Sequence, residues 1–162
     1  MTAQLSDILY YQNKAHGMCN EPLSKYLHDR SIKFIMPSTA LHRGYRARWL
    51  LSEDKLYLID LKAHIDHDNH VGLGYLFPRQ EKVFADWYSG TIKINQGDLI
   101  KYVHSGYGSV YQQSVYLVIE NGRLVNEYVK NNDSLISKAR RILGKLTTRK
   151  YINDYMFIEK RK

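Results

Sequence analysis

Short runs of aromatic and β-branched residues, separated at regular intervals by turn residues, fill most of this chain. The clearest turn is Asn121-Gly122, which lies between the runs Ser114–Glu120 and Arg123–Lys130. Asn-Gly between two such runs is the strongest local signal of a β-hairpin, because both residues tolerate a positive φ. About eight or nine strands at this spacing predict a mainly antiparallel β fold, either a sandwich or a partly open barrel.

A second hairpin is expected in the first half of the chain. Residues 39–51 alternate between an apolar face and a polar face, and residues 55–61 supply the return strand. If the three polar residues between them form the loop, Arg46 lies opposite Asp60. A slip of one residue would set Asp60 against Ala47 on the apolar face, so the pattern favours the first register. The apolar face of the first run contains Tyr45, Ala47, Trp49 and Leu51.

One short helix is predicted before these hairpins. Apolar residues recur at three- and four-residue spacing through Glu21–Arg30, with Asn20 as the N-cap and Pro22 in the first turn. Residues Ile8–Met18 are expected to form a first strand. Further strands are predicted at Ile32–Met36, Val71–Phe77, Val83–Tyr88, Thr91–Asn95 and Leu99–His104.

Positive charge is concentrated at the C-terminus. Residues 131–162 hold 9 Lys and Arg against 3 Asp and Glu, whereas residues 1–130 hold 15 against 13. An apolar stripe at helical spacing contains Leu135, Ala139, Ile142, Leu143 and Leu146. We therefore expect an α+β protein, with a β-rich domain at 1–130 and a basic amphipathic helical appendage at 131–162. The appendage would pack on the domain or on a partner.

The basic appendage suggests an acidic partner, such as nucleic acid, an anionic membrane surface or an acidic protein. A solvated helix face that aids solubility would carry the same residues. Binding along a phosphate backbone would be sequence-independent and sensitive to salt. The cations available for it are Lys138, Arg141, Lys145, Arg149 and Lys150.

Composition narrows the cellular setting. At 162 residues the chain fits one domain with a terminal appendage. Cys19 is the one cysteine, which excludes an intrachain disulfide and favours a reducing compartment. The sequence has neither a signal-peptide core nor an apolar run long enough to span a membrane. We expect a cytoplasmic protein without a cofactor.

Several short segments between about positions 38 and 128 form a recognisable set. They are Arg43-Gly44-Tyr45, Lys55-Leu56-Tyr57-Leu58, Leu76-Phe77-Pro78, Val83–Gly90, Gln96-Gly97, Tyr102-Val103-His104 and Gly106–Tyr111. In these segments the chain resembles a family of small, uncharacterised bacterial β-rich proteins. The resemblance implies a β-rich fold, and it carries no activity, cofactor or catalytic residue. Residues 131–162 lie outside it.

Three groups of residues could carry chemistry. His64, His67 and His70 are interleaved with carboxylates and could bind Zn²⁺, Ni²⁺ or Cu²⁺, although an exposed loop has the same composition. Arg43 and Arg48 could hold a phosphate or carboxylate, because a guanidinium binds either with two hydrogen bonds.

The third group is His104 with Asp86 and Tyr107. If their strands are neighbours, His104 and a carboxylate would form an acid–base pair. No nucleophile accompanies them, because the nearby serines lack an elbow sequence.

Three functions follow. The first is a non-enzymatic binding module of a bacterial or phage defence system, acting by protein–protein contact as an inhibitor, an immunity-type protein or a complex subunit, with a protein partner or as a homo-oligomer. The second is nucleic-acid binding through 131–162. The third is a small enzyme that uses His104 on a nucleotide or phosphate substrate.

Overall fold

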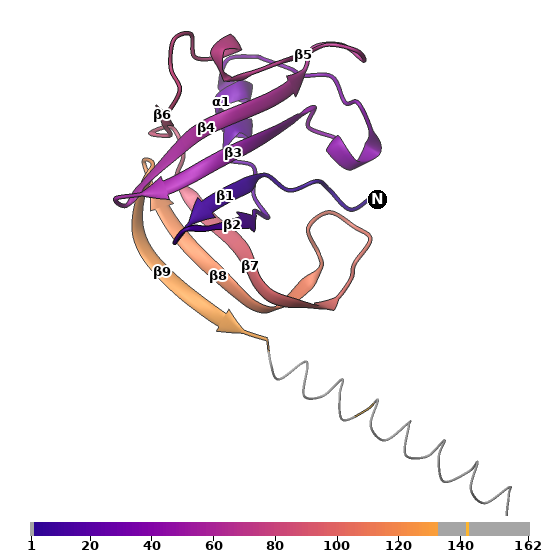
Figure 1. Cartoon of the computed structure of the whole chain (residues 1–162), viewed down its shortest axis with the longest axis vertical. Helices are drawn as coiled ribbons and strands as arrows, with labels where there is room; N and C mark the ends of the chain where they lie inside the picture. The colour runs from indigo at the N-terminus through magenta and orange to yellow at the C-terminus, as the bar shows by residue number, and fades with distance from the viewer. Residues whose placement is uncertain (1, 133–141, 143–162) are drawn as a thin grey trace, which may run out of the picture.

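The computed structural model describes residues 2–132 and residue 142, and the chain from 2 to 132 forms one β-rich body. A mixed sheet that is not closed runs in the order β2-β1-β3-β4-β9-β8-β7 (Figure 1). The strands on this path are β1 (Ile8–Tyr11), β2 (Lys14–Gly17), β3 (Tyr45–Ser52), β4 (Lys55–His64), β7 (Gly90–Lys101), β8 (Val110–Glu120) and β9 (Arg123–Asn131). The predicted β-rich class is confirmed.

Shorter elements flank this path. Strands β5 (His70–Val71) and β6 (Val83–Phe84) pair with β4. The described helices are α1 (Leu23–Asp29) and the 3₁₀ helices η1 (Thr39–Leu41) and η2 (Leu73–Tyr75). None of them has the length and apolar content that crossing a membrane requires. The predicted C-terminal helix lies outside the described residues, apart from Ile142.

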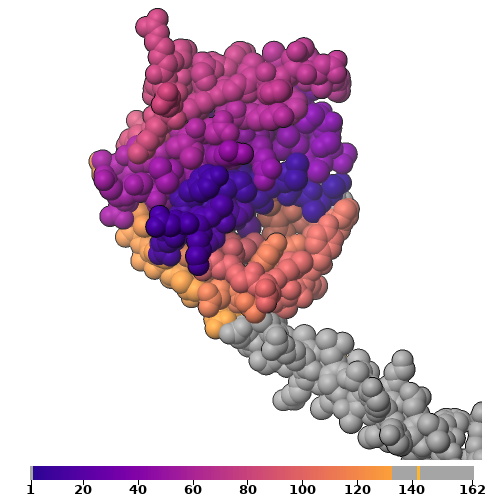
Figure 2. Space-filling view, viewed as in Figure 1, coloured from indigo at the N-terminus to yellow at the C-terminus, as the bar shows by residue number. Residues whose placement is uncertain are grey.

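The sheet curls so that its two end strands approach each other. Met18, just after β2, forms an isolated bridge with Ile94 of β7, and the Cys19 amide donates to the Lys93 carbonyl at 2.9 Å. Alternate residues of the strands fill the interior, as expected for period-two structure. The largest fully buried side chains include Trp49, Tyr45, Leu9, Met18 and Leu117. In Figure 2 the N-terminal residues (indigo) lie between the part of the molecule that holds β3 and β4 (purple) and the part that holds β7 to β9 (orange).

The first predicted strand is wrong, because Ile8–Met18 forms the hairpin β1–β2. Gln12 and Asn13 make the turn with φ values of 50° and 59°. Asn adopts this conformation more readily than most residues, so the turn needs no glycine. Strand β1 also runs parallel to β3, with Leu9 beside Trp49, so the sheet is mixed.

The register predicted for the second hairpin is also wrong. The turn is the two-residue Glu53-Asp54, with φ values of 51° and 57°, and Asp60 lies opposite Arg48. A register shift between Arg48 and Trp49 keeps the apolar residues facing inward on both sides of it. Arg46 instead donates from Nε to the Ser6 carbonyl at 2.9 Å.

The predicted helix is shorter than expected, and its cap is different. It begins at Leu23 after Pro22 and has no side-chain cap. The Asn20 carboxamide oxygen instead accepts a hydrogen bond from the Lys93 amide at 2.7 Å, which ties the start of the helix to β7. Asn20 therefore bonds to β7 instead of capping the helix.

Several predicted strand bounds change. Residues 32–36 are not a strand, and residues 39–41 are a 3₁₀ helix before β3 begins at Tyr45. Of the predicted strand 71–77, only Val71 belongs to a strand, β5, and of the predicted strand 83–88, only Val83 and Phe84 do, in β6. The two runs predicted at 91–95 and 99–104 form the continuous strand β7, which ends at Lys101 and has register shifts after Gln96.

Candidate functional site

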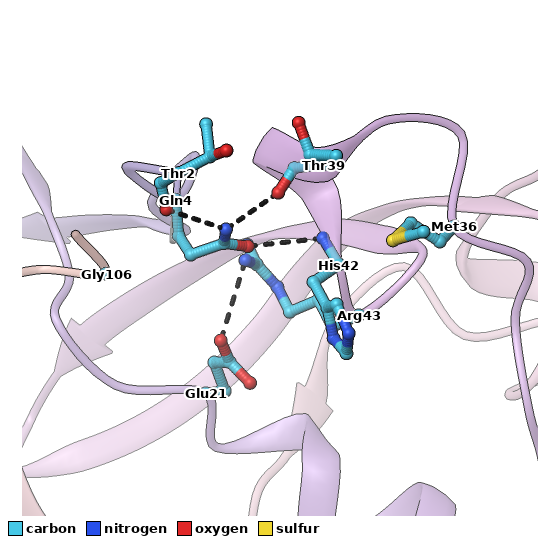
Figure 3. A pocket seen from close by; sticks show the side chains of 8 residues that line it. All are labelled: Thr2, Gln4, Glu21, Met36, Thr39, His42, Arg43 and Gly106. Atoms are coloured by element: carbon cyan, nitrogen blue, oxygen red, sulfur yellow. Dashed lines mark hydrogen bonds and ion pairs between the residues drawn. The ribbon is translucent and has the colours of Figure 1, made fainter. Parts of the chain in front are cut away.

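A pocket of about 470 Å³ opens between the N-terminal segment, η1 and the start of α1. Figure 3 shows Gln4 beside η1 and Glu21 below it, with the Arg43 side chain reaching between them. The lining side chains and backbone come from Thr2, Gln4, Glu21, Met36, Thr39, His42, Arg43 and Gly106. We call this hollow the N-terminal pocket.

The floor of the N-terminal pocket is built on a buried ion pair. Arg43 Nη2 lies 2.6 Å from Asp7 Oδ1, and the two side chains are 7% and 0% exposed. Asp7 also accepts hydrogen bonds from the Ala47 amide at 3.0 Å and from the Trp49 indole at 3.1 Å. Burial raises the pKa of Asp7, while Arg43 and the other donors oppose that shift. The carboxylate thus has partners from both β3 and the segment before it.

A second carboxylate lies on the pocket side of Arg43. Arg43 Nη1 donates to the Tyr107 hydroxyl at 3.0 Å, and that hydroxyl donates to Glu21 Oε1 at 2.9 Å. Ser24 donates to Glu21 Oε2 at 3.3 Å. Burial raises the pKa of Tyr107, so its hydroxyl keeps the proton that it shares with Glu21.

Charges in this network do not cancel. One guanidinium lies between two carboxylates, and Arg43 Nη1 is 3.7 Å from Glu21 Oε1. With both carboxylates ionised, the three residues carry a net charge of about −1. Such a site attracts a cation or a hydrogen-bond donor more strongly than an anion.

The outer wall of the pocket is held by Gln4. Its Nε2 donates to the carbonyls of Thr2 at 3.1 Å and Thr39 at 2.9 Å, and its Oε1 accepts from the His42 amide at 3.2 Å. A parallel bridge between Ala3 and Gly106 continues this wall. The first residues of the described chain are therefore part of the site.

A different kind of surface lies on β9. Within the described chain β9 pairs with β4 at one position, Lys55 with Arg123, and then diverges from it (Figure 1). Residues 126–130 pair with β8, and Val125 lies at a register shift in that ladder. Residues 125–130 all lie outside the β4 ladder and are exposed. We call them the β9 edge. Val125, Tyr128 and Val129 are 53%, 50% and 55% exposed.

A groove of about 720 Å³ separates β9 from the tips of the β1–β2 and β3–β4 hairpins. Glu53, Asp54 and Glu127 line it, and no Lys or Arg belongs to its described lining, so we call it the acidic groove. The Tyr11 hydroxyl donates to Glu127 Oε2 at 2.5 Å across it. Burial, together with this hydrogen bond to Glu127, raises the pKa of Tyr11 to about 12.

The structure disperses the predicted acid–base group. His104 Nδ1 lies 3.0 Å from the Tyr102 hydroxyl in an exposed segment. Tyr107 belongs to the Arg43 network, and Asp86 is exposed after β6. Among the described residues, no hydrogen bond joins His104 to Asp86 or to Tyr107.

The three histidines of the predicted metal cluster do not converge on one point. His64 and His70 are cross-strand neighbours with ring centroids 6.2 Å apart, while His67 is exposed in the loop between them. Asp66 accepts hydrogen bonds from the amides of Asp68 and Asn69, as in a tight turn. No group of three His, Cys, Asp or Glu among the described residues is placed to hold a metal ion.

The predicted anion-binding arginines have different surroundings. Arg43 is buried between carboxylates, as described above. Arg48 is exposed, with its Nε 3.7 Å from Asp60 Oδ2. The five cations predicted to bind nucleic acid, at positions 138, 141, 145, 149 and 150, lie outside the described residues.

Sequence reasoning missed Asp7 and Glu21. Asp7 precedes an apolar strand and Glu21 precedes a helix, positions at which acidic residues are common. One signal was available, because Asp7 is the acidic residue between the apolar Leu5 and Ile8.

Comparison of this chain with protein-family models, with curated proteins and with solved structures found no match.

Proposed function

We propose that this chain is a non-enzymatic binding module that contacts another protein through the β9 edge. An inhibitor, an immunity-type protein or a complex subunit of a bacterial or phage defence system would work in this way. The observation that carries the proposal is that residues 125–130 have a backbone edge outside the β4 ladder and are exposed on both faces of the strand.

An unpaired strand edge is a template for a further strand. An extended segment of a partner gains backbone hydrogen bonds from the edge and specificity from alternate side chains. Soluble proteins usually protect such edges with charges, proline or a covering loop. In the β9 edge, Val125, Tyr128 and Val129 lie close together in sequence and are half exposed. Tyr128 stacks on Tyr116 of β8 at 4.9 Å, which gives a flat aromatic surface beside the edge.

The acidic groove indicates the chemistry of the partner. A strand added to β9 would displace the Tyr11 hydroxyl from Glu127 and run beside Glu127, with Glu53 and Asp54 on the other side of the groove. Because the described lining of the groove holds these carboxylates and no Lys or Arg, it favours basic side chains on the incoming segment. We propose an extended segment that carries Lys or Arg at alternate positions.

A synthetic peptide in which Lys and Val alternate tests this function on the full chain. Fluorescence anisotropy should show binding that Val129→Lys weakens about tenfold or more, because the substitution places a cation at the centre of the contact. Leu99→Lys is the matched control: Leu99 is 49% exposed on β7, and the change in net charge is the same. A peptide with Glu in place of Lys should not bind.

Equal losses in the two variants would mean that the peptide responds to net charge alone, and the proposed surface would then be wrong. No effect of Val129→Lys would place the contact elsewhere. Proteins encoded beside the gene are the natural source of physiological partners, and a genuine one should show the same dependence on Val129.

Nucleic-acid binding is a second candidate, and its support is the sequence of residues 131–162, where Lys and Arg outnumber Asp and Glu by 9 to 3. Filter binding of the full chain to duplex DNA should weaken steeply as salt rises, because each phosphate contact releases counterions. Substituting Gln for Lys138, Arg141 and Lys145 together should reduce that salt dependence. Binding that is insensitive to salt would reject this candidate.

A further inference from the structure

We propose that the N-terminal pocket binds a cationic group, a primary ammonium or a guanidinium, carried on an apolar stem. The ligand would be a small amine or the end of a basic side chain. This inference is independent of the β9 edge, since the pocket is formed by the N-terminal segment, η1 and the start of α1.

Charge is the first reason. Arg43 is 7% exposed, and its charge is already opposed by Asp7 at 2.6 Å. Glu21, with its side chain 32% exposed, is the carboxylate that remains in excess and still reaches the pocket. An arriving cation would neutralise the pocket, whereas an arriving anion would add to its negative charge.

Preorganisation is the second reason. Tyr107 and Ser24 each donate a hydrogen bond to one oxygen of Glu21, so the carboxylate is fixed before a ligand arrives. The Tyr45 hydroxyl lies 2.8 Å from Ser24 and extends this support into the core. A carboxylate oxygen accepts more than one hydrogen bond, so both oxygens keep capacity for a ligand. Little conformational freedom would be lost on binding.

The pocket also suits an apolar stem. Its volume of about 470 Å³ lies within the range of small-molecule sites. Met36, 43% exposed, forms part of its lining opposite Glu21 (Figure 3). A thioether side chain adapts to apolar ligands of different shapes. A polar end at Glu21 and an apolar side at Met36 define a ligand with one charged end.

An anion is the natural alternative, because Arg43 was predicted to hold phosphate. Its Nη2 donates to Asp7 and its Nη1 to Tyr107. Its Nε has no described partner, but it is buried below the surface of the pocket. A phosphate in the pocket would also approach the Glu21 carboxylate, which repels it.

Three probes of nearly equal shape test the inference: n-hexylammonium, hexanol and hexanoate. Titration of the full chain, followed by backbone amide chemical shifts, should show n-hexylammonium binding about tenfold or more tightly than hexanol, and hexanoate most weakly. The shifts should cluster at the residues of the N-terminal pocket. Glu21→Gln should bring n-hexylammonium down to the affinity of hexanol.

Glu81→Gln is the control, because this substitution removes the same charge at an exposed residue between η2 and β6, away from the pocket lining. Met36→Trp is a second variant: it fills the pocket without changing its charge, and it should weaken n-hexylammonium and hexanol alike. Val129→Lys should leave all three affinities unchanged, which separates this site from the β9 edge. Three results would each overturn the inference. They are equal binding of n-hexylammonium and hexanol to the parent chain, tightest binding of hexanoate, and no effect of Met36→Trp.

Discussion

Arg43 is almost completely buried, so its contribution to stability depends on what surrounds it. Replacing it with Met leaves the Asp7 carboxylate, 0% exposed, without a cation. Breaking a buried ion pair from one side typically costs about 3–5 kcal/mol. We expect Arg43→Met to lower the free energy of unfolding by that amount in urea titrations.

The double variant Asp7→Asn with Arg43→Met should recover much of the loss. It removes the stranded charge, and the Asn oxygen can still accept from the Ala47 amide. Arg48→Met is the control, because Arg48 and Asp60 are 58% and 53% exposed, and such pairs are worth about 1 kcal/mol or less. Equal costs for the Arg43 and Arg48 variants would show that the buried pair is not a structural requirement.

Ionisation of the Tyr11 phenol makes the free energy of unfolding depend on pH in the alkaline range. Burial first, and then the hydrogen bond to Glu127, raises its pKa from 10.0 to about 12. The unfolded chain therefore loses this phenol proton at a lower pH than the folded chain does. The stabilisation is complete below pH 10 and is lost as pH rises to about 12.

Tyr11→Phe should make the decline in the free energy of unfolding shallower across this interval. Burial also raises the pKa values of Tyr45 and Tyr107, so a smaller decline should persist in the variant. Urea titrations at several alkaline pH values measure both slopes. An unchanged slope would mean that Tyr11 ionises in the folded protein as it does in the unfolded chain.

At the scale of the element, the β8–β9 hairpin depends on Gly122. Its φ is +76°, and a Cβ built there would lie 2.7 Å from the Ala85 carbonyl oxygen. Gly122→Ala combines left-handed strain with a backbone clash, so we expect a loss of about 2–4 kcal/mol in thermal or urea unfolding.

Gly74 provides the comparison. A Cβ there would meet nothing within 4 Å, so Gly74→Ala should change stability by about 1 kcal/mol or less. If the two alanine variants were equally stable, the turn at Gly122 would not lie close to Ala85, in the segment after β6.

Local pattern predicted some elements well. The Asn121-Gly122 turn lies where expected, and β9 begins at Arg123, as the sequence indicates. The alternation in β3 correctly identified its buried face, from Tyr45 to Leu51. These features depend on residues close together in the chain, whose periodicity and turn preferences can be read directly.

Pairings between distant segments could not be read in the same way. The register shift after Arg48 leaves the pattern of each strand intact, so alternation gave the faces and missed the partners. The same limit applied to the site. Arg43 was identified as a candidate, but its partners Asp7 and Glu21 come from other segments that no local period connects to it.

At the scale of the whole molecule, the sheet has two halves joined by a short seam. Strands β2, β1, β3 and β4 form one half, and β9, β8 and β7 the other. Between β4 and β9 the seam consists of one residue pair, with hydrogen bonds from the Leu56 amide to Gly122 and from the Leu124 amide to Asp54. Beyond it, the Tyr11–Glu127 hydrogen bond crosses the acidic groove. The β9 edge therefore has fewer neighbours than any central strand of the sheet.

Hydrogen exchange should reveal this asymmetry. Alternate amides of an antiparallel edge strand bond to one neighbour while the others face outward. In residues 126–130 we expect protected and unprotected amides to alternate, and the protected ones to open at lower free energy than those of β8, which is paired on both sides. Binding of the Lys-Val peptide should protect the outward-facing set and leave β3 unchanged. Uniform protection along β9 in the free protein would mean that this edge is already covered, and a partner strand could not add to it.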